Sequence, residues 1–454
     1  MTENLSASEK EYRKMTGTPI PKLILSLSVP TVIAMMVTAV YNVADTYFVS
    51  QLGTSASGAT GIVFSLMAII QAVGFTFGMG SGSIISRLLG QKKVRESGIV
   101  GTSAFFASVA FGVLLGVGGI AFLSPFMRLL GAKGEILPLA EEYAFFILMA
   151  SPVMASSFVL NNLLRSEGKA RLAMIGIGFG GILNIALDPL FIFTFDMGIR
   201  GAAVATAISQ TVSFSILLFN FIRRRTTVAL RFCFISRRAG TYAAILKNGM
   251  PSFCRQGIAS IATVMLNRAA AGFGDAAVAA MSIVGKIIMM VFSVLIGFGQ
   301  GYQPVCGYNY SSRHYLRVKS AYRFMLWVGV AIMAVLGCGV FILAPGLMTE
   351  FINDDPAVVE IGALALRMQC VSLPFIAVGV ACNMTFQSVG KAGMATFTSS
   401  FRQGFFFVPL IVILPRVLGL TGVQLTQPIA DVLTCFVSIP LITGYLRSLP
   451  DSDE

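Results

Sequence analysis

Four oxygen-bearing side chains within long apolar stretches are the residues best suited to chemistry. Asp45 and Asp188 are carboxylic acids, Thr206 is a hydroxyl, and Asn184 precedes Asp188 by four residues, which places both on one face of a helix. If these stretches cross a membrane, an ionised side chain near the bilayer centre costs at least about 2.5–3.5 kcal/mol and requires a reason to be there. Carboxylate, amide and hydroxyl oxygens suit a hard cation, and a carboxylate pair can equally carry a proton.

The turns that follow these residues predict a common depth. Asp45 stands about two helical turns before the turn at Gly53, and Asp188 stands about two turns before the turn near Gly198. Thr206 lies less than two turns beyond the second of these turns. We therefore expect one polar cluster in the outer half of the first bundle, either a cation cage or a proton-carrying network.

Other charged residues within apolar stretches leave alternatives open. In a purely structural alternative, Asp188 merely starts a kink with Pro189, and Asp45 pairs with a base. However, no base lies within either stretch. Asp431 is either functional or solvated near the outer end of its helix. Arg255 and Lys286 either line a cavity or direct their charges to helix carbonyls, and we favour a structural or gating role.

The elements that hold these residues are membrane helices. Hydrophobic residues make up 56% of the 454-residue chain and charged residues only 12%, whereas soluble domains carry about 25% charged residues. Backbone groups in hydrocarbon must be satisfied internally, so each apolar stretch is expected to be a helix. The predicted spans are 22–49, 58–86, 97–123, 138–162, 171–195, 200–222, 242–271, 277–307, 320–344, 357–385, 394–415 and 422–446.

Lysine and arginine predict the orientation. They concentrate in the N-terminal segment, in alternate connections (including Arg87 and Arg165) and after the last span, so both termini are expected in the cytoplasm. The net charge of +13 is therefore explained by topology and not by nucleic-acid binding. Seven cysteines without a Cys-x-x-Cys pair indicate neither a disulfide framework nor a metal framework.

The two halves of the chain repeat each other. Pro30 and Gly53 match Pro251 and Gly274 at an offset of 221 residues, and further matches, beginning with Pro152 and Pro374, follow at an offset of 222. We therefore predict an all-α membrane protein of twelve helices in two pseudo-symmetric six-helix bundles. The expected segments are a tail (1–20), a first lobe (21–222), a basic linker (223–241), a second lobe (242–447) and a tail (448–454).

Several motifs in order resemble one known family, the multidrug and toxic compound extrusion (MATE) transporters, in their bacterial DinF-like branch. The motifs are Tyr41-Asn-Val-Ala-Asp45, GSIISRLLG from Gly82, NNLLRSEGK from Asn161, NIALDP from Asn184, GIRGAAVATAISQ from Gly198, PSFCRQ from Pro251 and GQGYQPVCGYN from Gly299. The resemblance implies a V-shaped pair of lobes that exports organic compounds in exchange for H+ or Na+. It also implies a first-lobe cation site, which would bind Na+ if that is the coupling ion, at Asp45, Asn184, Asp188 and Thr206, with the Ala202 carbonyl as a further ligand. The second lobe lacks the helix 7 and helix 10 acids of another branch, so a second Na+ site is not expected.

The sequence thus predicts a secondary antiporter for cationic amphipathic compounds, and not an enzyme. We expect a monomeric multi-pass protein in a bacterial plasma membrane, whose partners are small-molecule substrates and the lipid bilayer, with no cofactor beyond the coupling ion. A lipid-linked precursor flippase is the alternative, and an uncoupled channel or receptor is a third class. The expected substrate cavity is lined by Tyr41, Asn42, Asn161, Gln210, Arg255, Met281, Lys286 and Met289.

Overall fold

Long apolar helices make up nearly all of the computed structural model, which describes residues 7–351 and 355–453. The predicted tails reach residues 1–6 and 454, which lie outside the described part. The first half contains α1 (Ala7–Gly17), α2 (Ile20–Ser50), α3 (Thr54–Gly90), α4 (Val94–Ala121), α5 (Leu123–Leu129), α6 (Ile136–Ser166), α7 (Ala170–Pro189), η1 (Leu190–Thr194) and α8 (Gly198–Ile222). The second contains η2 (Phe232–Phe234), α9 (Ala239–Ala271), α10 (Asp275–Ser311), α11 (Tyr315–Phe351), α12 (Pro356–Val389), α13 (Ala392–Ser400), η3 (Phe401–Phe407), α14 (Val408–Leu418) and α15 (Leu420–Arg447).

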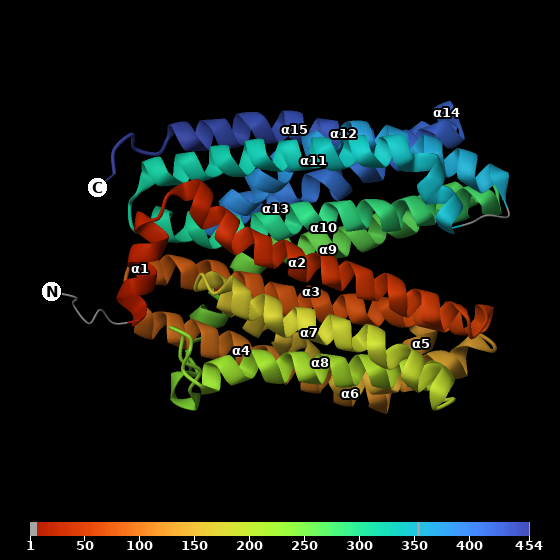
Figure 1. The fold of residues 1–454 in the computed structure, drawn as a ribbon, viewed down its shortest axis with the longest axis horizontal. Helices are drawn as coiled ribbons and strands as arrows, with labels where there is room; N and C mark the ends of the chain where they lie inside the picture. Colours follow the sequence, from red (N-terminus) through yellow and green to blue (C-terminus); the bar gives the residue numbers. More distant parts are fainter. Residues whose placement is uncertain (1–6, 352–354, 454) are drawn as a thin grey trace.

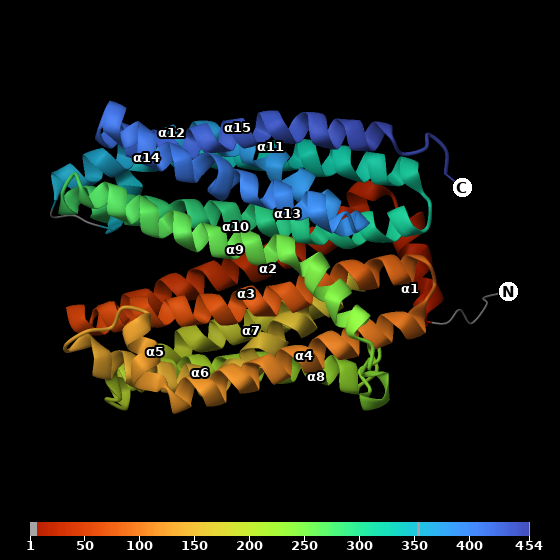
Figure 2. The same ribbon diagram turned by 180° about the vertical axis from the view of Figure 1, so that it is seen from behind.

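Eleven helical segments of the described residues are long and apolar enough to cross a membrane. The twelfth, α9, is 33 residues long but carries Lys247, Arg255 and Arg268, and it packs against α3 and α13 as one of the bundle. In Figures 1 and 2 the helices from α2 to α8 form one lobe and those from α9 to α15 form the other, with both termini at the same end of the molecule. The predicted all-α fold of two six-helix bundles is confirmed.

The fifth helix of each lobe is interrupted by a π-helical segment. In the first lobe α7 ends at Pro189 and continues as η1, and in the second lobe η3 separates α13 from α14. Asp188 directly precedes the first segment, and Arg402 lies inside the second. Because π-helical turns frequently occur at functional sites, these two charged side chains are candidates for a functional role.

The lobes pack closely in one half of their length. α2 lies against α10, and α3 lies against α9. A Cβ atom at Gly80 or Gly249 would overlap the backbone of the facing helix, so these glycines permit a near-contact of main chains. The Ser28 hydroxyl adds a 2.9 Å hydrogen bond to the Phe298 carbonyl across the same boundary. This is the half nearest the chain termini.

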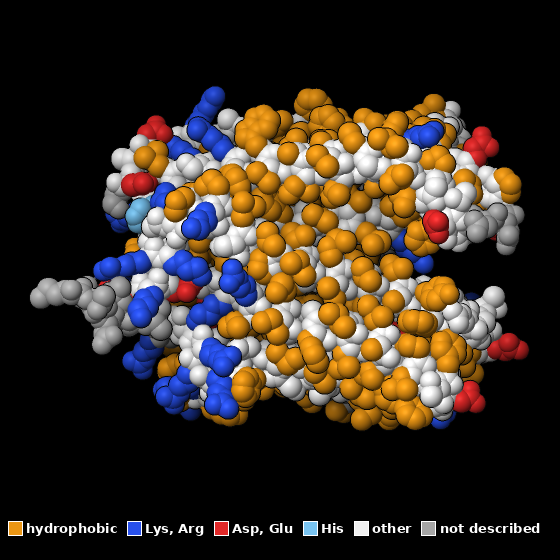
Figure 3. All heavy atoms as spheres, in the orientation of Figure 1, with side chains coloured by type: hydrophobic (Ala, Val, Ile, Leu, Met, Phe, Trp, Pro, Cys, Tyr) orange, Lys and Arg blue, Asp and Glu red, His pale blue; other side chains and the backbone are white. Residues whose placement is uncertain are grey.

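Lysine and arginine gather around the end that carries the termini (Figure 3), which we call the basic end. At the opposite end the space-filling surface is notched between the lobes (Figure 3). Apolar side chains cover the belt between the two ends. The lobes are therefore joined at the basic end and parted at the other, which gives the predicted V shape.

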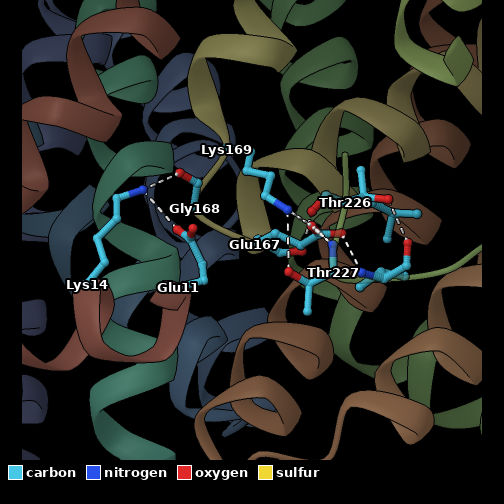
Figure 4. Close-up of polar contacts among 10 residues, drawn as sticks. Glu11, Lys14, Glu167, Gly168, Lys169, Thr226 and Thr227 are labelled. Atoms are coloured by element: carbon cyan, nitrogen blue, oxygen red, sulfur yellow. Dashed lines mark hydrogen bonds and ion pairs between the residues drawn. The ribbon is translucent and has the colours of Figure 1, made fainter. Parts of the chain in front are cut away.

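Polar contacts at the basic end bind α1 and the inter-lobe segment to the first lobe (Figure 4). The buried Glu167 carboxylate accepts hydrogen bonds from the backbone N–H groups of Thr227 and Val228, at 2.7 and 3.0 Å, and pairs with Lys169 at 3.1 Å. Lys14 of α1 donates to the Gly168 carbonyl at 3.3 Å. The segment predicted as a linker is thus fixed where it leaves the first lobe.

The C-terminal segment is held in a similar way by the second lobe. Lys319 of α11 lies 2.6 Å from the carboxylate of Asp451 and also donates to the Leu449 carbonyl at 2.9 Å. The hydrogen bond and the charge of this ammonium hold the pKa of Asp451 below its ordinary value. Helix α1 and residues 449–451 are therefore both held at the basic end.

Candidate functional site

The two first-lobe acids come together inside the bundle. Asp45 on α2 and Asp188 at the end of α7 are 3% and 0% exposed, and they lie close enough for their charges to interact. The Asn184 amide donates to Asp188 Oδ1 at 3.3 Å and to Thr206 Oγ1 at 3.4 Å. Ala202, one turn before Thr206 on α8, is also buried. The structure therefore gathers Asp45, Asn184, Asp188 and Thr206 at one level.

Three oxygen atoms of this cluster have no hydrogen-bond partner among the described residues: Asp45 Oδ1, Asn184 Oδ1 and Asp188 Oδ2. A buried oxygen without a partner is costly unless a cation or a proton satisfies it. No described group of three His, Cys, Asp or Glu side chains comes together in the chain. An ion held here would therefore complete its coordination with amide, hydroxyl and carbonyl oxygens, which suit Na+. The alternative is a proton shared between the two carboxyl groups.

Two further buried hydroxyls near this level were not predicted from the sequence. Tyr143 of α6 is fully buried near both acids, and its hydroxyl has no hydrogen-bond partner among the described residues. Ser209, the residue directly before Gln210, is another buried hydroxyl without a hydrogen-bond partner among the described residues. Tyr143 sits in an apolar stretch where tyrosine is unremarkable in sequence, so only the packing of α6 against α8 brings it to the cluster.

A narrow cavity of about 70 Å³ lies next to the acid cluster in the first lobe. It is lined by Tyr41, Asn161 and Gln210, three of the predicted cavity residues. Met35, Thr38, Gln71 and Phe75 line both this cavity and the larger one between the lobes. Asn42, on the same helix as Asp45, faces the larger cavity. One helix, α2, thus carries residues of the acid cluster and of both cavities.

The central cavity between the lobes has a volume of about 300 Å³ and a mixed lining. Arg255 and Met289 line it, as predicted, together with Phe75, Phe292 and several amides. Met281, about two turns before Met289 on α10, is instead buried in the core of the second lobe. Lys286 is exposed and is not among the residues that line this cavity.

An ion pair in the cavity wall settles the position of Asp431. This carboxylate is 2% exposed and accepts hydrogen bonds from Arg402 Nε at 2.6 Å, Gln427 at 2.8 Å and Ser372 at 3.2 Å. The Arg402 guanidinium lies over the Phe292 ring, 4.8 Å from its centroid. The alternative of a solvated Asp431 is therefore wrong, since neighbouring helices cover the side chain.

Arginine side chains also close the basic end of the cavity. Arg165 of the first lobe donates to Gln300 of the second and to Asn162 at 2.6 Å. Gln300 lines both the central cavity and a small cavity of about 30 Å³ beside Arg165. Arg87 and Arg165 were expected in polar connections, but both lie within helices, and Arg165 is only 5% exposed. The α6 helix simply continues past the point where the hydrophobic pattern stops.

The family profile named MatE matches residues 30–190 and 251–413, one block in each lobe. The chain belongs to the MatE family. Its curated relatives include the multidrug export protein MepA of Staphylococcus saprophyticus, which is 28% identical over 94% of both chains. MatE proteins are transporters, so this chain is a multi-pass membrane transporter and not an enzyme.

Solved MatE structures superpose closely on this fold. One, described as an outward-facing conformation of a multidrug resistance MATE family transporter of the MOP superfamily, gives a TM-score of 0.93 at 28% identity and covers 99% of this chain and 100% of its own. Another, from Pyrococcus furiosus, gives a TM-score of 0.92 at 28% identity over 98% of this chain and 99% of its own. Its description states that a reversed polarity of the binding pocket suggests a different function for that transporter.

Proposed function

We propose that this chain is a secondary antiporter that exports organic amphipathic compounds, in exchange for H+ or Na+, by alternating access. The observation that carries the proposal is the pair Asp45 and Asp188, buried together with unsatisfied oxygens. The name of the MepA relatives supports multidrug export as the direction and substrate range. A cationic charge on these compounds, expected from the sequence, stays a prediction.

Coupling would act through α2. A cation bound between Asp45 and Asp188 offsets the repulsion of two buried carboxylates and draws α2 towards α7. Asn42 lies on the same helix and faces the central cavity, so such a shift changes the wall that contacts the substrate. Ion and substrate then disfavour each other, and by linkage the effect is equal in both directions.

We further propose that the basic end faces the cytoplasm of a bacterium and that the structure represents an outward-facing state. The concentration of lysine and arginine at that end supports the orientation. The notch at the opposite end and the similarity to a structure described as outward-facing support the state. In this proposal the transporter acts as a monomer without a cofactor other than its coupling ion.

The decisive experiment is transport in proteoliposomes with pH and Na+ gradients imposed independently. Asp45→Asn should reduce gradient-driven dye export by roughly tenfold or more, because the variant no longer exchanges an ion. Glu142→Gln removes an equal charge from an exposed ion pair with Arg200 and should transport like the wild type. Coupled export at the wild-type rate by Asp45→Asn would refute the proposal.

A lipid-linked precursor flippase remains the second candidate because Arg255 places a positive charge in the central cavity. Such a protein would bind a lipid diphosphate. Arg402, another base on which this alternative depends, also lines the cavity but is paired with Asp431. The third base, the exposed Lys286, is not among the residues that line the cavity. Tight binding of a polyprenyl diphosphate that is lost in Lys286→Ala would favour the flippase over the antiporter.

A further inference from the structure

The central cavity has an uneven charge balance. Among the residues that line it, the ionisable side chains are Arg255, Arg402 and Asp431. Arg402 and Asp431 neutralise each other through their 2.6 Å hydrogen bond. Arginine keeps its proton in proteins, so Arg255 leaves the cavity with one net positive charge. A substrate whose only charge is positive would meet repulsion here.

Arg255 has few partners for its five N–H donors. Within the described part of the chain the guanidinium makes a 3.7 Å contact from Nη2 to the sulfur of Met79, which is a weak acceptor. No carboxylate lies within ion-pairing distance of it among the described residues, and the side chain is partly buried. A partly buried guanidinium without an oxygen acceptor from the protein has N–H donors free for a ligand, and an anionic oxygen group gives the strongest hydrogen bonds to it.

The surroundings hold Arg255 in place. The next residue, Gln256, donates a 2.9 Å hydrogen bond to Gln71 of the first lobe, and Ser252, one turn earlier, donates to Met79 at 3.1 Å. These contacts fix the cavity face of α9 against α3. Phe75 and Phe292 supply aromatic surface in the same cavity, which suits a flat apolar body next to a charged group.

We infer that Arg255 is a docking point for an anionic oxygen group, so that the substrates of this transporter include amphipathic acids and zwitterions that carry a carboxylate, sulfonate or phosphate. The anionic group of the substrate would accept two parallel hydrogen bonds from the Arg255 guanidinium, while the aromatic body of the substrate packs against Phe75 and Phe292. The inference rests on the proposed function in assigning the cavity to a transported compound.

The test compares two dyes that differ in one charge. Rhodamine B carries a free carboxylate, and its ethyl ester is a cation with the same aromatic body. Equilibrium binding of each dye would be measured by fluorescence polarisation on the full chain in phosphatidylcholine nanodiscs. We expect the wild type to bind the acid more tightly than the ester. Arg255→Gln should lower the affinity for the acid by about tenfold or more, while the affinity for the ester stays the same or increases.

Two further variants control for folding and for general charge. Arg255→Lys keeps the charge but not the planar fork and should retain part of the preference for the acid. Arg268→Gln removes the same charge from an exposed position of α9 that is not among the cavity residues, and it should bind both dyes like the wild type. Equal losses for acid and ester in Arg255→Gln would overturn the inference, as would a wild type that prefers the ester.

The nanodisc lipid distinguishes a soluble acid from a lipid headgroup. Replacing part of the neutral lipid with phosphatidylglycerol should leave acid binding unchanged if a free compound is the ligand. Competition by this lipid in the wild type, absent in Arg255→Gln, would still support the anion site but would assign it to a lipid phosphate. Since binding is measured without a gradient, Asp45→Asn should keep the preference for the acid. A failure of the proposed coupling can therefore be distinguished from a failure of the anion site at Arg255.

Discussion

Nη1 of Arg87, on α3 of the first lobe, donates a 3.0 Å hydrogen bond to the backbone carbonyl of Ser388, on α12 of the second. Nη2 of the same guanidinium bonds Asn248 Oδ1 of α9 at 3.1 Å. Together with Arg165 and Gln300, these contacts tie the lobes at the end where the structure is closed. In the alternating access that we propose, this closure must open, so these bonds contribute to the balance between the two states.

Arg87→Ala should therefore shift the population towards opening at the basic end. Hydrogen bonds to a charged group contribute about 1.5–3 kcal/mol each, so the closed state should lose roughly tenfold or more in relative population. Spin labels at Gln51 and Asp275, on opposite sides of the notch, would report a shorter distance, with the exposed Cys233 and Cys338 replaced by serine. An unchanged distance distribution would show that Arg87 does not hold the closure.

Gly249→Ala should separate the lobes by steric overlap. A Cβ atom at Gly249 would collide with the Thr76 carbonyl of the facing helix. Overpacking of this kind costs about 1–3 kcal/mol and acts on the closed state. Gly257→Ala is the matched control, since it lies on the same helix with open space around the added methyl group. Gly249→Ala should lower both the melting temperature and the rate of dye export. Equal values for Gly249→Ala and Gly257→Ala would contradict the close approach of the two helices.

Arg402→Gln should strongly destabilise the second lobe. It leaves the buried Asp431 carboxylate with only Gln427 and Ser372 as donors, and an unpaired buried charge costs about 3–5 kcal/mol. The double variant Arg402→Gln/Asp431→Asn should recover much of that loss, because no uncompensated charge remains. Melting temperatures in detergent would give the comparison, and additive effects of the two substitutions would argue that the pair is not coupled.

Glu167→Ala should loosen the segment between the lobes. Its carboxylate accepts the backbone N–H groups of Thr227 and Val228, which lie beside three arginines that trypsin recognises, Arg223, Arg224 and Arg225. We expect faster tryptic cleavage in this segment, by roughly tenfold if local opening becomes about 1.4 kcal/mol easier. Glu142→Ala, at an exposed pair, should be cut at the wild-type rate. Protection equal to the wild type in Glu167→Ala would mean that other contacts hold the segment.

The sequence by itself determined the fold class and the level of the acid cluster. Twelve apolar stretches, a repeat at nearly constant offset and the glycine turns that end the spans suffice, because helical rise per residue is fixed and converts distance from a turn into depth. Depth placed Asp45, Asp188 and Thr206 together, and the four-residue spacing of Asn184 and Asp188 placed both on one face.

Only the tertiary structure decided which side chains meet across helices. Rise gives depth but not the rotation of one helix against another, so nothing in the sequence could pair Arg402 with Asp431 or bring Tyr143 to the acids. For the same reason, the sequence wrongly predicted Arg87 and Arg165 in connections and Met281 in the cavity. In the structure the two arginines lie at the closure between the lobes, and Met281 lies in the core. Packing also left Arg255 facing the cavity without a carboxylate, because Asp431, the acid among the residues that line this cavity, is paired with Arg402.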